Sequence, residues 1–512
     1  MVRNIFSLER GRRFAKPNLR SLPTIYDKNY VYLHTFYYKI FVFYILFITQ
    51  RPEIYIHFIT KMILNRKALK KMQEWRVKKE RKPLLLRGAR QVGKTTIVNM
   101  FAKEFQVYLS INLERQSDKA VFDRTDSIDE ILSAIYLLKN VIPAEGNTLL
   151  FIDEIQESPK AIQLLRYFYE QHPELYVIAA GSLLEFSLVD VASYPVGRVE
   201  YLCLHPMDFE EFLMALDYSA ALEQLKYIPI PPFAHEMLLK LFHEYAIIGG
   251  MPEAVREYAM HKNIAAIGPI YQQLWQAYKD DSEKYAKNDT ERKVLRHILD
   301  TAPKENDRIA FERFGHSNYR SREVGEAMRA LDMAKVIQLI YPTTAVMPPI
   351  MTDMKKRPRL QMLDTGLLNQ AIGLQGEMIG VRDLNDFYRG KIIQHLVTQQ
   401  LIAMHDDPSY KPHFWVREDT NANAEVDLVF QHRQHIIPIE VKSGEQGRLR
   451  SLHQFIERCD HVYGVRLGAN TLSVERAVTP GKRKNYLLLN LPYYLTVKLH
   501  EYLDWFLEKH KF

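Results

Sequence analysis

The chain has 512 residues, of which 47% are hydrophobic and 25% are charged. This balance is typical of globular proteins with packed cores, so it excludes a disordered or low-complexity chain, and the length allows about three domains. The two cysteines, Cys203 and Cys459, exclude a disulfide framework, so we expect a reducing, cytoplasmic compartment.

The net charge of +8 comes almost entirely from the first 61 residues, which hold ten Lys and Arg against three Asp and Glu. The rest of the chain is nearly neutral, so a nucleic-acid contact there would depend on local patches. The apolar run Ile40–Ile48 is shorter than the roughly 20 residues of a membrane-spanning helix. We expect residues 1–61 to be an extension outside the native protein, without stable membrane association. A single membrane anchor is the alternative.

From Lys82 onward, apolar strands alternate with helices. The expected strands are Pro83–Arg87, Val107–Leu113, Thr148–Asp153 and Leu175–Ala180, and the expected helices are Thr95–Phe105, Ile128–Asn140 and Lys160–Gln171. This alternation indicates an α/β domain whose mostly parallel sheet is covered on both faces. We assign the domain to residues 62–215.

A phosphate-binding loop follows the first strand. Residues Gly88–Thr95 fit the pattern G-x-x-x-x-G-K-[ST] at every fixed position, between a strand and a helix as the motif requires. Backbone N–H groups of the loop would face the phosphates of ATP, Lys94 would reach the β- and γ-phosphates, and Thr95 would bind Mg²⁺. The residues expected to hold the nucleotide are Gly88, Ala89, Arg90, Gln91, Val92, Gly93, Lys94, Thr95, Thr96 and Asp153.

The strand Thr148–Asp153 delivers two acidic residues to its carboxyl end, where open parallel sheets bind ligands. We expect Asp153 to hold Mg²⁺ through water and Glu154 to orient the attacking water. An isolated Asp-Glu pair can also cap a helix, but the upstream phosphate-binding loop argues against that interpretation. Ser182 follows the next strand and is placed either as a γ-phosphate sensor or as a hydroxyl that caps a helix.

Residues 216–350 are expected to be mainly helical. The helices Glu291–Thr301, Arg308–Phe314 and Arg320–Met333, followed by a strand at Val336–Tyr341, have the order of a winged helix. Arg320, Arg322 and Arg329 would then lie on its third helix. A helical lid with a solvated basic face is the alternative.

Residues 351–512 form a second α/β unit. Its expected elements are the helices Arg389–His405, Arg448–Arg458 and Tyr494–His510 and the strands His413–Arg417, Ala424–Phe430 and Ile436–Lys442. The last two strands are expected to pair as a hairpin with its turn between Arg433 and Gln434.

This hairpin register would place Asp427 opposite Glu440 and Glu425 opposite Lys442, all on one face because side chains alternate along a strand. The other face would carry the apolar residues Val426, Leu428, Phe430, Ile437, Ile439 and Val441. Opposed carboxylates repel each other, and a divalent cation such as Mg²⁺ or Mn²⁺ would relieve that repulsion. We therefore expect Asp427 and Glu440 to be metal ligands, with Lys442 stabilising charge on a phosphate.

The chain resembles the prokaryotic AAA-type P-loop ATPases that carry a C-terminal domain related to the PD-(D/E)XK nucleases, including proteins with a DUF4143 domain. The resemblance covers about residues 62–512. Besides the phosphate-binding loop, it is carried by Ile111–Glu114, Phe151–Glu154, Gly181-Ser182, Gly197-Arg198, Gly249–Glu253, Leu363–Leu367 and Glu425–Asp427.

This resemblance implies roles for several residues. Arg198 would act as an arginine finger toward a neighbouring subunit of a homo-oligomer, although a structural Arg is an equal alternative. Asp427, Glu440 and Lys442 match the nuclease motif, and Gln454 is a further match. Related chains place Glu where this chain has Gln394, and an amide oxygen binds metals more weakly than a carboxylate does, so the domain is either an active nuclease or an inactive remnant.

We therefore expect a cytoplasmic Mg²⁺-dependent ATPase whose nucleotide state gates a nuclease-like domain that interacts with DNA. The alternative is a signalling or assembly switch in which the C-terminal domain cleaves nothing.

Overall fold

The computed structural model describes residues 64–143, 147–182, 195, 197–282, 286, 288–305, 307–374, 391–417, 424–442 and 449–511. The chain divides into two units, residues 1–60 and 61–512, and the first unit lies outside the described residues. The expected N-terminal extension and its apolar run therefore remain a prediction. Within the described ranges, no helix combines the length and the apolar character needed to cross a membrane.

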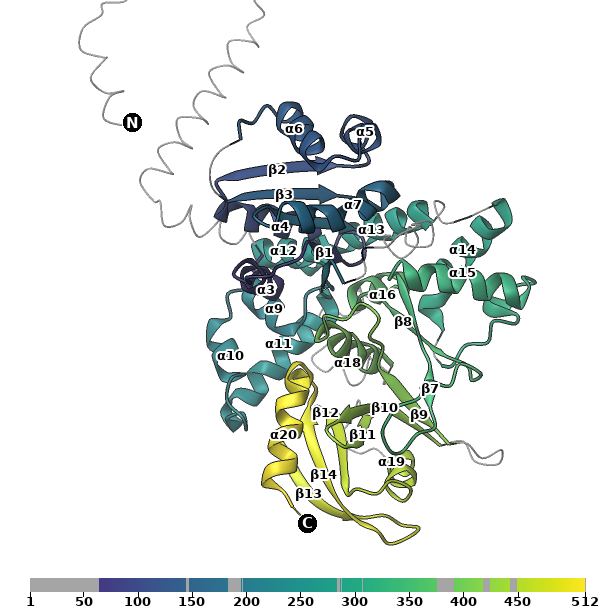
Figure 1. Ribbon diagram of the computed structural model, residues 1–512. Helices are drawn as coiled ribbons and strands as arrows, with labels where there is room; N and C mark the ends of the chain where they lie inside the picture. The colour runs from purple at the N-terminus through teal and green to yellow at the C-terminus, as the bar shows by residue number, and fades with distance from the viewer. Residues whose placement is uncertain are drawn as a thin grey trace, which may run out of the picture. The chain divides into compact units, whose positions relative to one another are not determined.

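A five-stranded parallel sheet organises the first half of the described chain (Figure 1). Its strands are β1 (Leu84–Arg87), β2 (Val107–Asn112), β3 (Thr148–Asp153), β4 (Tyr176–Gly181) and β5 (Glu200–Cys203). The order in space is β2-β3-β4-β1-β5, and each neighbouring pair is parallel. The expected parallel-sheet α/β domain is confirmed. The edge strand β5 was not predicted, because exposed Tyr201 interrupts its apolar pattern.

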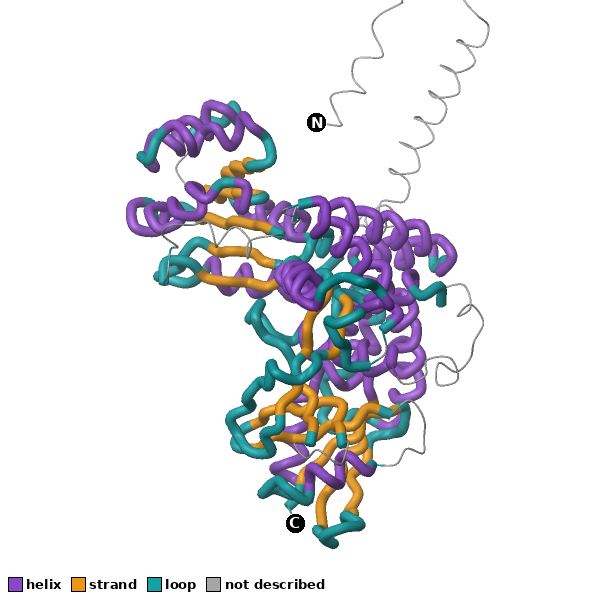
Figure 2. The backbone as a smooth tube through the Cα atoms, turned by 90° about the vertical axis from the view of Figure 1, so that its right-hand side faces the viewer, coloured by secondary structure: helices purple, strands orange, loops and turns teal. Residues whose placement is uncertain are grey.

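Helices cover both faces of this sheet (Figure 2). One face packs against α3 (Lys67–Arg76) and α4 (Lys94–Phe101), and the other against α5 (Gln116–Arg124), α6 (Ile128–Leu138) and α7 (Pro159–Gln171). Leu84 and Leu86 enter the first core and Leu85 enters the second, which explains why β1 is apolar at consecutive positions.

Five helices follow the sheet and pack into the same core as its α3 and α4 face. They are α9 (Phe209–Ala215), α10 (Ser219–Gln224), α11 (His235–Ile248), α12 (Pro252–His261) and α13 (Ile267–Ser282). The helical character expected for this part of the chain is therefore present.

The next segment combines helices with a small sheet. Its elements are α14 (Asp289–Thr301), the 3-10 turn η8 (Phe314–His316), α15 (Ser321–Met333), β6 (Ile337–Ile340) and β8 (Arg359–Met362). The two strands are antiparallel, and Arg308 forms a further antiparallel bridge with Arg359. The helix expected at Arg308–Phe314 was wrong in its first part, because Arg308 is extended and pairs with β8.

The C-terminal half contains a seven-stranded sheet of order β13-β14-β12-β11-β10-β9-β7. These strands are β7 (Pro342–Thr343), β9 (His413–Val416), β10 (Glu425–His432), β11 (His435–Val441), β12 (Tyr463–Gly468), β13 (Ser473–Val478) and β14 (Asn485–Pro492). The helices of this half are α16 (Thr365–Ala371), α18 (Lys391–Ala403), α19 (Arg450–Ile456) and α20 (Leu499–Lys509). Strand β7 comes from the loop between β6 and β8, so the preceding segment supplies the edge of this sheet.

The β10–β11 hairpin has the register expected from the sequence, running from Leu428↔Ile439 to His432↔His435. The pairing of β10 with β9 shifts between Val426 and Val429, as in a β-bulge. Val426 therefore packs with the α19 core, while Leu428 packs in the opposite core. The prediction that all six apolar residues of the hairpin share one face was wrong at Val426 for this reason.

Candidate functional site

The phosphate-binding loop occupies the turn between β1 and α4, and its glycines are required by geometry. Gly88 has a φ of +146° and Gly93 a φ of +96°, in the region that favours glycine. A Cβ atom on Gly88 would lie 2.2 Å from the backbone oxygen of Leu204, just after β5. The loop therefore curls in a way that side chains at these positions would prevent.

Lys94 is buried at the base of the loop, with 7% of its surface exposed. Its Nζ donates hydrogen bonds to the carbonyls of Gly88 and Ala89, both at 2.9 Å. Burial lowers the pKa of Lys94 to about 8, and the nearby Glu154 and Asp153 oppose this shift. Among the described residues, the structure records no ion pair for Lys94, and a phosphate in front of the loop would give this poorly solvated cation an anionic partner.

Asp153, at the end of β3, is joined directly to the loop. Its Oδ2 accepts a hydrogen bond from the Thr95 hydroxyl at 2.9 Å, and its Oδ1 accepts one from the Glu154 N–H at 3.1 Å. Burial raises the pKa of the Asp153 carboxyl. The hydroxyl and the carboxylate are the two oxygen ligands that P-loop proteins use for Mg²⁺.

Glu154 follows at the carboxyl end of the strand with φ +51°, a left-handed conformation that is rare for residues other than glycine. Its carboxylate accepts a hydrogen bond of 2.6 Å from the Gln156 amide. Such strained positions concentrate at functional sites, because the surrounding structure must hold them in place. Gln156 was not singled out from the sequence, since a lone glutamine in a turn carries no recognisable signal.

Ser182 and Arg198 lie at opposite ends of the parallel strands. Ser182 follows β4 at the carboxyl edge, is 3% exposed, and its Oγ has no hydrogen-bond partner among the described residues. Arg198 precedes β5 at the amino edge, where its Nε is 2.8 Å from Glu170 Oε1. Because the strands are parallel, Arg198 is separated from its own chain's phosphate-binding loop by the length of the sheet.

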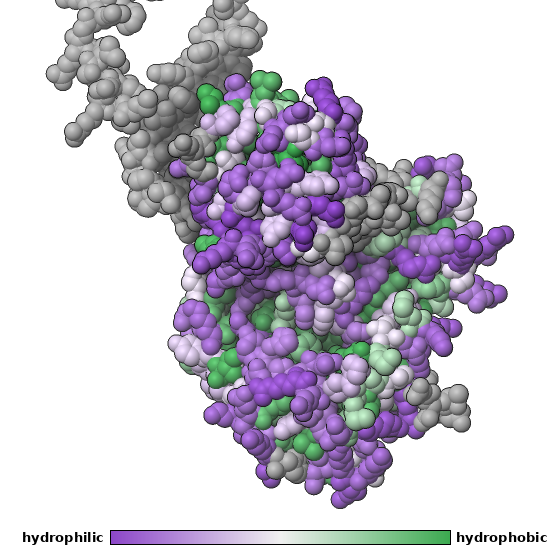
Figure 3. Space-filling view, in the orientation of Figure 1, coloured by the Kyte–Doolittle hydropathy of each residue, from purple (hydrophilic) through white to green (hydrophobic). Residues whose placement is uncertain are grey.

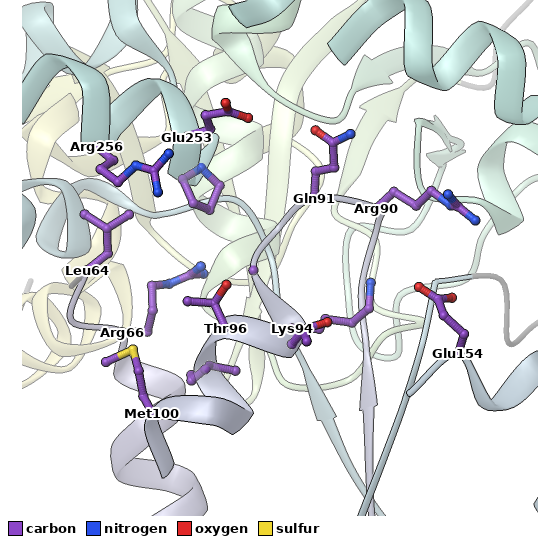
Figure 4. A pocket seen from close by; sticks show the side chains of 14 residues that line it. Leu64, Arg66, Arg90, Gln91, Lys94, Thr96, Met100, Glu154, Glu253 and Arg256 are labelled. Carbon is purple, nitrogen blue, oxygen red and sulfur yellow. The ribbon is translucent and has the colours of Figure 1, made fainter. Parts of the chain in front are cut away.

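A cavity of about 480 Å³ opens in front of the phosphate-binding loop. Figure 4 shows Lys94, Arg90 and Glu154 at one end of this cavity and Leu64, Met100 and Arg256 at the other. The end with Lys94 is charged and the far end is partly apolar. A nucleotide, with a phosphate tail and an apolar base, has the same polarity along its length.

Several residues that line this cavity were not assigned roles from the sequence. The start of α12 contributes Pro252, Glu253 and Arg256, and the segment before α3 contributes Arg66. Arg66 donates to the carbonyl of Val92 in the phosphate-binding loop at 2.9 Å. The one signal in the sequence was the resemblance at Gly249–Glu253, to which no role was attached.

The two glycines before α12 allow close packing that fixes the start of this helix. A Cβ on Gly250 would lie 2.2 Å from the Met207 oxygen, and one on Gly249 would lie 2.4 Å from Asp364 Oδ1. The Asp364 carboxylate, which is fully buried, accepts a 2.6 Å hydrogen bond from the N–H of Gly250. The far end of the cavity is therefore positioned by a residue from the segment after β8.

Asp364 also connects this cavity to α18. The Gln399 amide donates to Asp364 Oδ2 at 3.2 Å, and the neighbouring Gln400 donates to Tyr245 Oη at 2.8 Å. One turn or more earlier in α18, the Gln394 amide is 3.4 Å from Asp427 Oδ1. A single rigid helix therefore contacts both the support of the nucleotide cavity and the acidic residues of the C-terminal sheet.

The predicted carboxylates Asp427 and Glu440 lie together on the β10–β11 hairpin. Asp427 Oδ2 accepts a hydrogen bond from the Val441 N–H at 2.9 Å, and Glu440 Oε1 is 2.6 Å from Lys442 Nζ. Burial, followed by the nearby Asp427, raises the pKa of Glu440 to about 7. Glu440 Oε2 is buried without a hydrogen-bond partner among the described residues.

Arginines from the preceding segment occupy this acidic face. Arg359 forms an ion pair with Glu425, lies 3.8 Å from Asp427 Oδ1, and donates to the Asp427 carbonyl at 2.9 Å. Arg308 Nε is 3.0 Å from the second oxygen of Glu425. Glu425 was expected to face Lys442, but the shifted pairing of β10 places it against the two arginines instead.

The remaining predicted residue of this face is Gln454, whose recorded side-chain partner is Arg458. It lies in α19, and its side-chain oxygen accepts a hydrogen bond of 2.8 Å from Arg458. Across the described ranges, no group of three or more His, Cys, Asp or Glu side chains is arranged to hold a metal ion. Apart from Glu425, which is paired with two arginines, the acidic face offers the carboxylates of Asp427 and Glu440 and the amide of Gln394, with protein cations already beside them.

Three family models match successive parts of the chain. Residues 80–213 match the AAA domain, residues 239–378 match a domain of unknown function, DUF8612, and residues 389–494 match another, DUF4143. These matches support the resemblance stated from the sequence, with an AAA domain in the first part of the chain and a DUF4143 domain in the last part. No curated protein matches the sequence.

Several solved structures share a limited similarity with the chain. The Walker-type ATPase of Pyrococcus abyssi is 13% identical, with a TM-score of 0.41 over 60% of this chain and 96% of that one. The Orc1 protein of Aeropyrum pernix in complex with DNA is 14% identical, with a TM-score of 0.27 over 63% and 93%. RuvB of Thermotoga maritima, a Holliday junction branch migration motor, is 14% identical, with a TM-score of 0.25 over 57% and 93%.

Proposed function

We propose that the chain binds ATP·Mg²⁺ in the cavity before the phosphate-binding loop and hydrolyses it. The observation that carries this proposal is the convergence of buried Lys94, the hydrogen-bonded pair Thr95 and Asp153, and Glu154 at one end of one cavity. These groups supply a cation for the phosphates, oxygen ligands for Mg²⁺ and a carboxylate to orient water.

The remaining residues of the site have distinct roles in this proposal. Mg²⁺ would be held by Thr95 and Asp153, and it would neutralise charge on the phosphates. Ser182, whose hydroxyl has no partner among the described residues, would donate to the γ-phosphate. Arg198 lies at the amino edge of the sheet, so it would act only on the nucleotide of a neighbouring copy in a homo-oligomer.

We further propose that the nucleotide state controls the C-terminal domain. Arg256 and Pro252 line the cavity at the start of α12, and Asp364 holds the two glycines before them. Because Gln399 and Gln394 of α18 contact Asp364 and Asp427 respectively, a movement of α12 on nucleotide binding would be transmitted to the acidic face. In the first candidate function, this movement gates a nuclease-like domain that uses a divalent ion at Asp427 and Glu440.

The second candidate function is an ATP-dependent switch that cleaves nothing, and a specific observation favours it. Arg359 and Arg308 both form ion pairs with Glu425, and Arg359 also lies 3.8 Å from Asp427 Oδ1, so protein cations already balance much of the negative charge of this face. Gln394 also stands where a third carboxylate would strengthen metal binding. The first candidate function is supported by Glu440 Oε2, which has no hydrogen-bond partner within the described ranges and could bind an ion.

One set of measurements on the full chain tests these proposals. ATP binding is measured by calorimetry, phosphate release by a coupled assay, and cleavage of labelled DNA with Mg²⁺ or Mn²⁺ present. Lys94→Ala should abolish binding and release, whereas Lys103→Ala, an exposed lysine nearby, should change neither. Undiminished phosphate release by Lys94→Ala would overturn the ATPase proposal. ATP-stimulated cleavage that Asp427→Asn removes would favour the first candidate over the second.

A test of the connection uses Asp364→Asn, which keeps the side-chain shape and removes the charge that the Gly250 N–H and the Gln399 amide face. The variant should retain phosphate release but lose any effect of ATP on the protection of α18 from hydrogen exchange. An ATP effect on α18 equal to that of the wild type would contradict the proposed route.

A further inference from the structure

The segment from α14 to β8 has the connectivity of a winged helix-turn-helix. Its order is helix α14, the extended residue Arg308, the short turn η8, helix α15, strand β6, a long loop and strand β8. Arg308 pairs with β8, and β8 pairs with β6, which gives a small antiparallel sheet beside two packed helices. In proteins of this kind, the last helix and the loop between the strands are the elements that meet a duplex.

Helix α15 has one buried and one exposed side. Val324, Met328 and Leu331 are fully buried in the core. The exposed side carries Arg322, whose side chain is 88% exposed, and Arg329 two turns later. Arg322 is paired with Glu326 at this solvated surface, and such a pair contributes little to stability. Beside Glu326, the exposed side thus offers two arginines to an anionic partner.

The loop between β6 and β8 is anchored in its first part and exposed in its second. Strand β7, at Pro342–Thr343, pairs with β9, and Ile350 packs against the core under α19. Beyond this anchor, Met351 is 72% exposed and Met354 is 70% exposed. The exposed part is thus presented from a fixed base, so its position is largely set before a partner binds.

Three consecutive basic residues, Lys355, Lys356 and Arg357, occupy this exposed part. Across the described residues, the structure records no ion pair or hydrogen bond for any of the three side chains, unlike Arg359 two positions later. Residues 308–359 hold ten Lys and Arg against five Asp and Glu, whereas residues 62–512 as a whole carry a net charge of only +1. Hydrophilic side chains cover the right-hand edge of Figure 3, where Figure 1 places α14 and α15.

We propose that residues 351–357 and the exposed side of α15 form a binding surface for duplex DNA. The three cations of the loop would contact phosphates, which supply most of the affinity of sequence-independent binding. An α-helix fits the major groove of B-form DNA, and an apolar side chain such as Met351 or Met354 fits the minor groove. Neither segment contains Phe, Tyr or Trp, the stacking platforms that single-strand binders use, so the duplex is favoured over single strands.

This surface lies next to the acidic face. Arg357 precedes Arg359 by two residues, and Arg359 contacts Glu425 and Asp427. A duplex held by Lys355–Arg357 would therefore bring a phosphate backbone close to these carboxylates and to Arg359. The proposal does not depend on ATP hydrolysis, since none of its residues lines the nucleotide cavity.

The test is fluorescence anisotropy of a labelled duplex of about 25 base pairs, long enough for more than two helical turns, with the full chain at several salt concentrations. Replacement of Lys355, Lys356 and Arg357 by Ala should weaken binding of unrelated sequences to a similar degree. It should also reduce the slope of log K against log salt by about three, roughly one for each cation removed from a phosphate. Replacement of Arg320, Arg322 and Arg329 should weaken binding separately.

The matched control replaces Lys70, Lys79 and Lys103, three exposed lysines of the ATPase domain, and thus removes the same charge. This control should retain the wild-type salt slope. An equal loss of affinity in the control and in the Lys355–Arg357 variant would overturn the proposal, as would single-stranded DNA or RNA binding as tightly as the duplex. A loss caused by Met351→Ser and Met354→Ser while the Lys355–Arg357 variant binds like the wild type would also overturn it, because the three cations would then make no contact with phosphates.

Two further measurements on the same samples keep the result interpretable. Thermal melting at the wild-type temperature establishes that each variant is folded, and ATP calorimetry measures the nucleotide site independently. Absence of ATP binding with intact DNA binding would refute the proposed ATPase and leave this surface standing. If the wild-type chain binds ATP but not DNA, the DNA-binding surface is refuted and the proposed nucleotide site stands.

Discussion

The nucleotide cavity and the acidic face both place buried carboxylates beside a lysine, yet the two regions differ in what stands in front of those charges. In the cavity, Lys94 is held by two carbonyls, and open space of about 480 Å³ lies before it. On the acidic face, Lys442 already contacts Glu440, and Arg359 reaches in from another segment. The first region is arranged to receive a ligand, whereas most of the negative charge of the second region is already paired with cations of the same chain.

This difference shows what a motif specifies and what it leaves open. The phosphate-binding loop is contiguous, so its glycines and its flanking strand and helix fix backbone donors as well as side chains. The acidic residues share a strand pair, but their environment depends on whatever packs against that pair. A cation from a distant segment can take the place of a metal ion without any change in the motif itself.

Among the substitutions that would test this difference between the two regions, Lys94→Ala should have the largest effect. Removal of the buried cation that faces the phosphates should weaken ATP binding about 1,000-fold, the cost of leaving a buried charge unpaired. Calorimetry with ATP and Mg²⁺ measures the change, with Lys103→Ala as the control. Nucleotide affinity within a few-fold of wild type would contradict the assignment of this cavity.

Glu154→Gln should separate binding from chemistry in the same cavity. The amide keeps the shape and the Gln156 contact but is a poor base, so phosphate release should fall about 100-fold while ATP affinity stays near wild type. Single-turnover measurements with labelled ATP follow the effect, and Gln156→Ala serves as a neighbouring control. A normal rate would assign Glu154 to a structural role at its strained backbone position.

Arg359→Ala addresses the other side of the comparison. If Arg359 takes the place of a metal ion, its removal should raise the affinity of Asp427 and Glu440 for Mn²⁺ about tenfold, because the positive charge that repels the ion is then absent. Calorimetric titration of the full chain, with Asp427→Asn as the background, measures this affinity. Arg308→Ala should have a smaller effect, because Arg308 contacts Glu425 and not Asp427. If neither Arg359→Ala nor Arg308→Ala binds Mn²⁺, the acidic face is a structural charge cluster.

The smallest expected effect concerns His205, which connects the segment after β5 with the residues after α18. Its Nε2 contacts the His405 carbonyl at 3.1 Å, just after α18, and burial lowers its pKa to about 4. The unfolded chain takes up a proton near the ordinary pKa of about 6.5, whereas the folded chain does not, so acid favours unfolding. Between pH 7 and pH 6, about 0.7 kcal/mol of stability should be lost.

Urea unfolding at the two pH values measures this loss. His205→Gln, which retains a hydrogen-bond donor and does not titrate, should lose less stability than the wild type over the same interval. The exposed His316→Gln should keep the wild-type dependence. Identical pH dependence in all three proteins would contradict the assignment to His205.

Much of the ATPase domain was predictable because its signals are local. Four strands, three helices and the phosphate-binding loop follow from residues adjacent in sequence, and the β10–β11 register follows from the hairpin itself. Strand β5 was missed because only β1 pairs with it among the described strands and its own pattern is mixed. The β-bulge that turns Val426 to the other face depends on β9, which the hairpin pattern does not contain.

The same distinction explains what was missed at the sites. Arg66 and Arg256 come from segments on either side of the sheet domain, and no spacing rule places them at the cavity. Arg359 was unpredictable because its partners, Glu425 and Asp427, lie more than 60 residues away on another sheet. Ser182 was singled out because it directly follows a core strand, and its role as a γ-phosphate sensor stays a prediction.

The two residues of β7 determine where the chain can be cut. They cover the outer edge of β9 in a sheet that otherwise belongs to the segment after residue 413. A fragment begun after Thr343 would keep the pairing of β9 with β10 but would expose the N–H and C=O groups on the other side of β9, and such bare edges recruit strands from other molecules. Recombinant C-terminal fragments should therefore begin before residue 342. Fragments that begin later should aggregate through this edge, and the aggregation would mask the activity of the isolated domain.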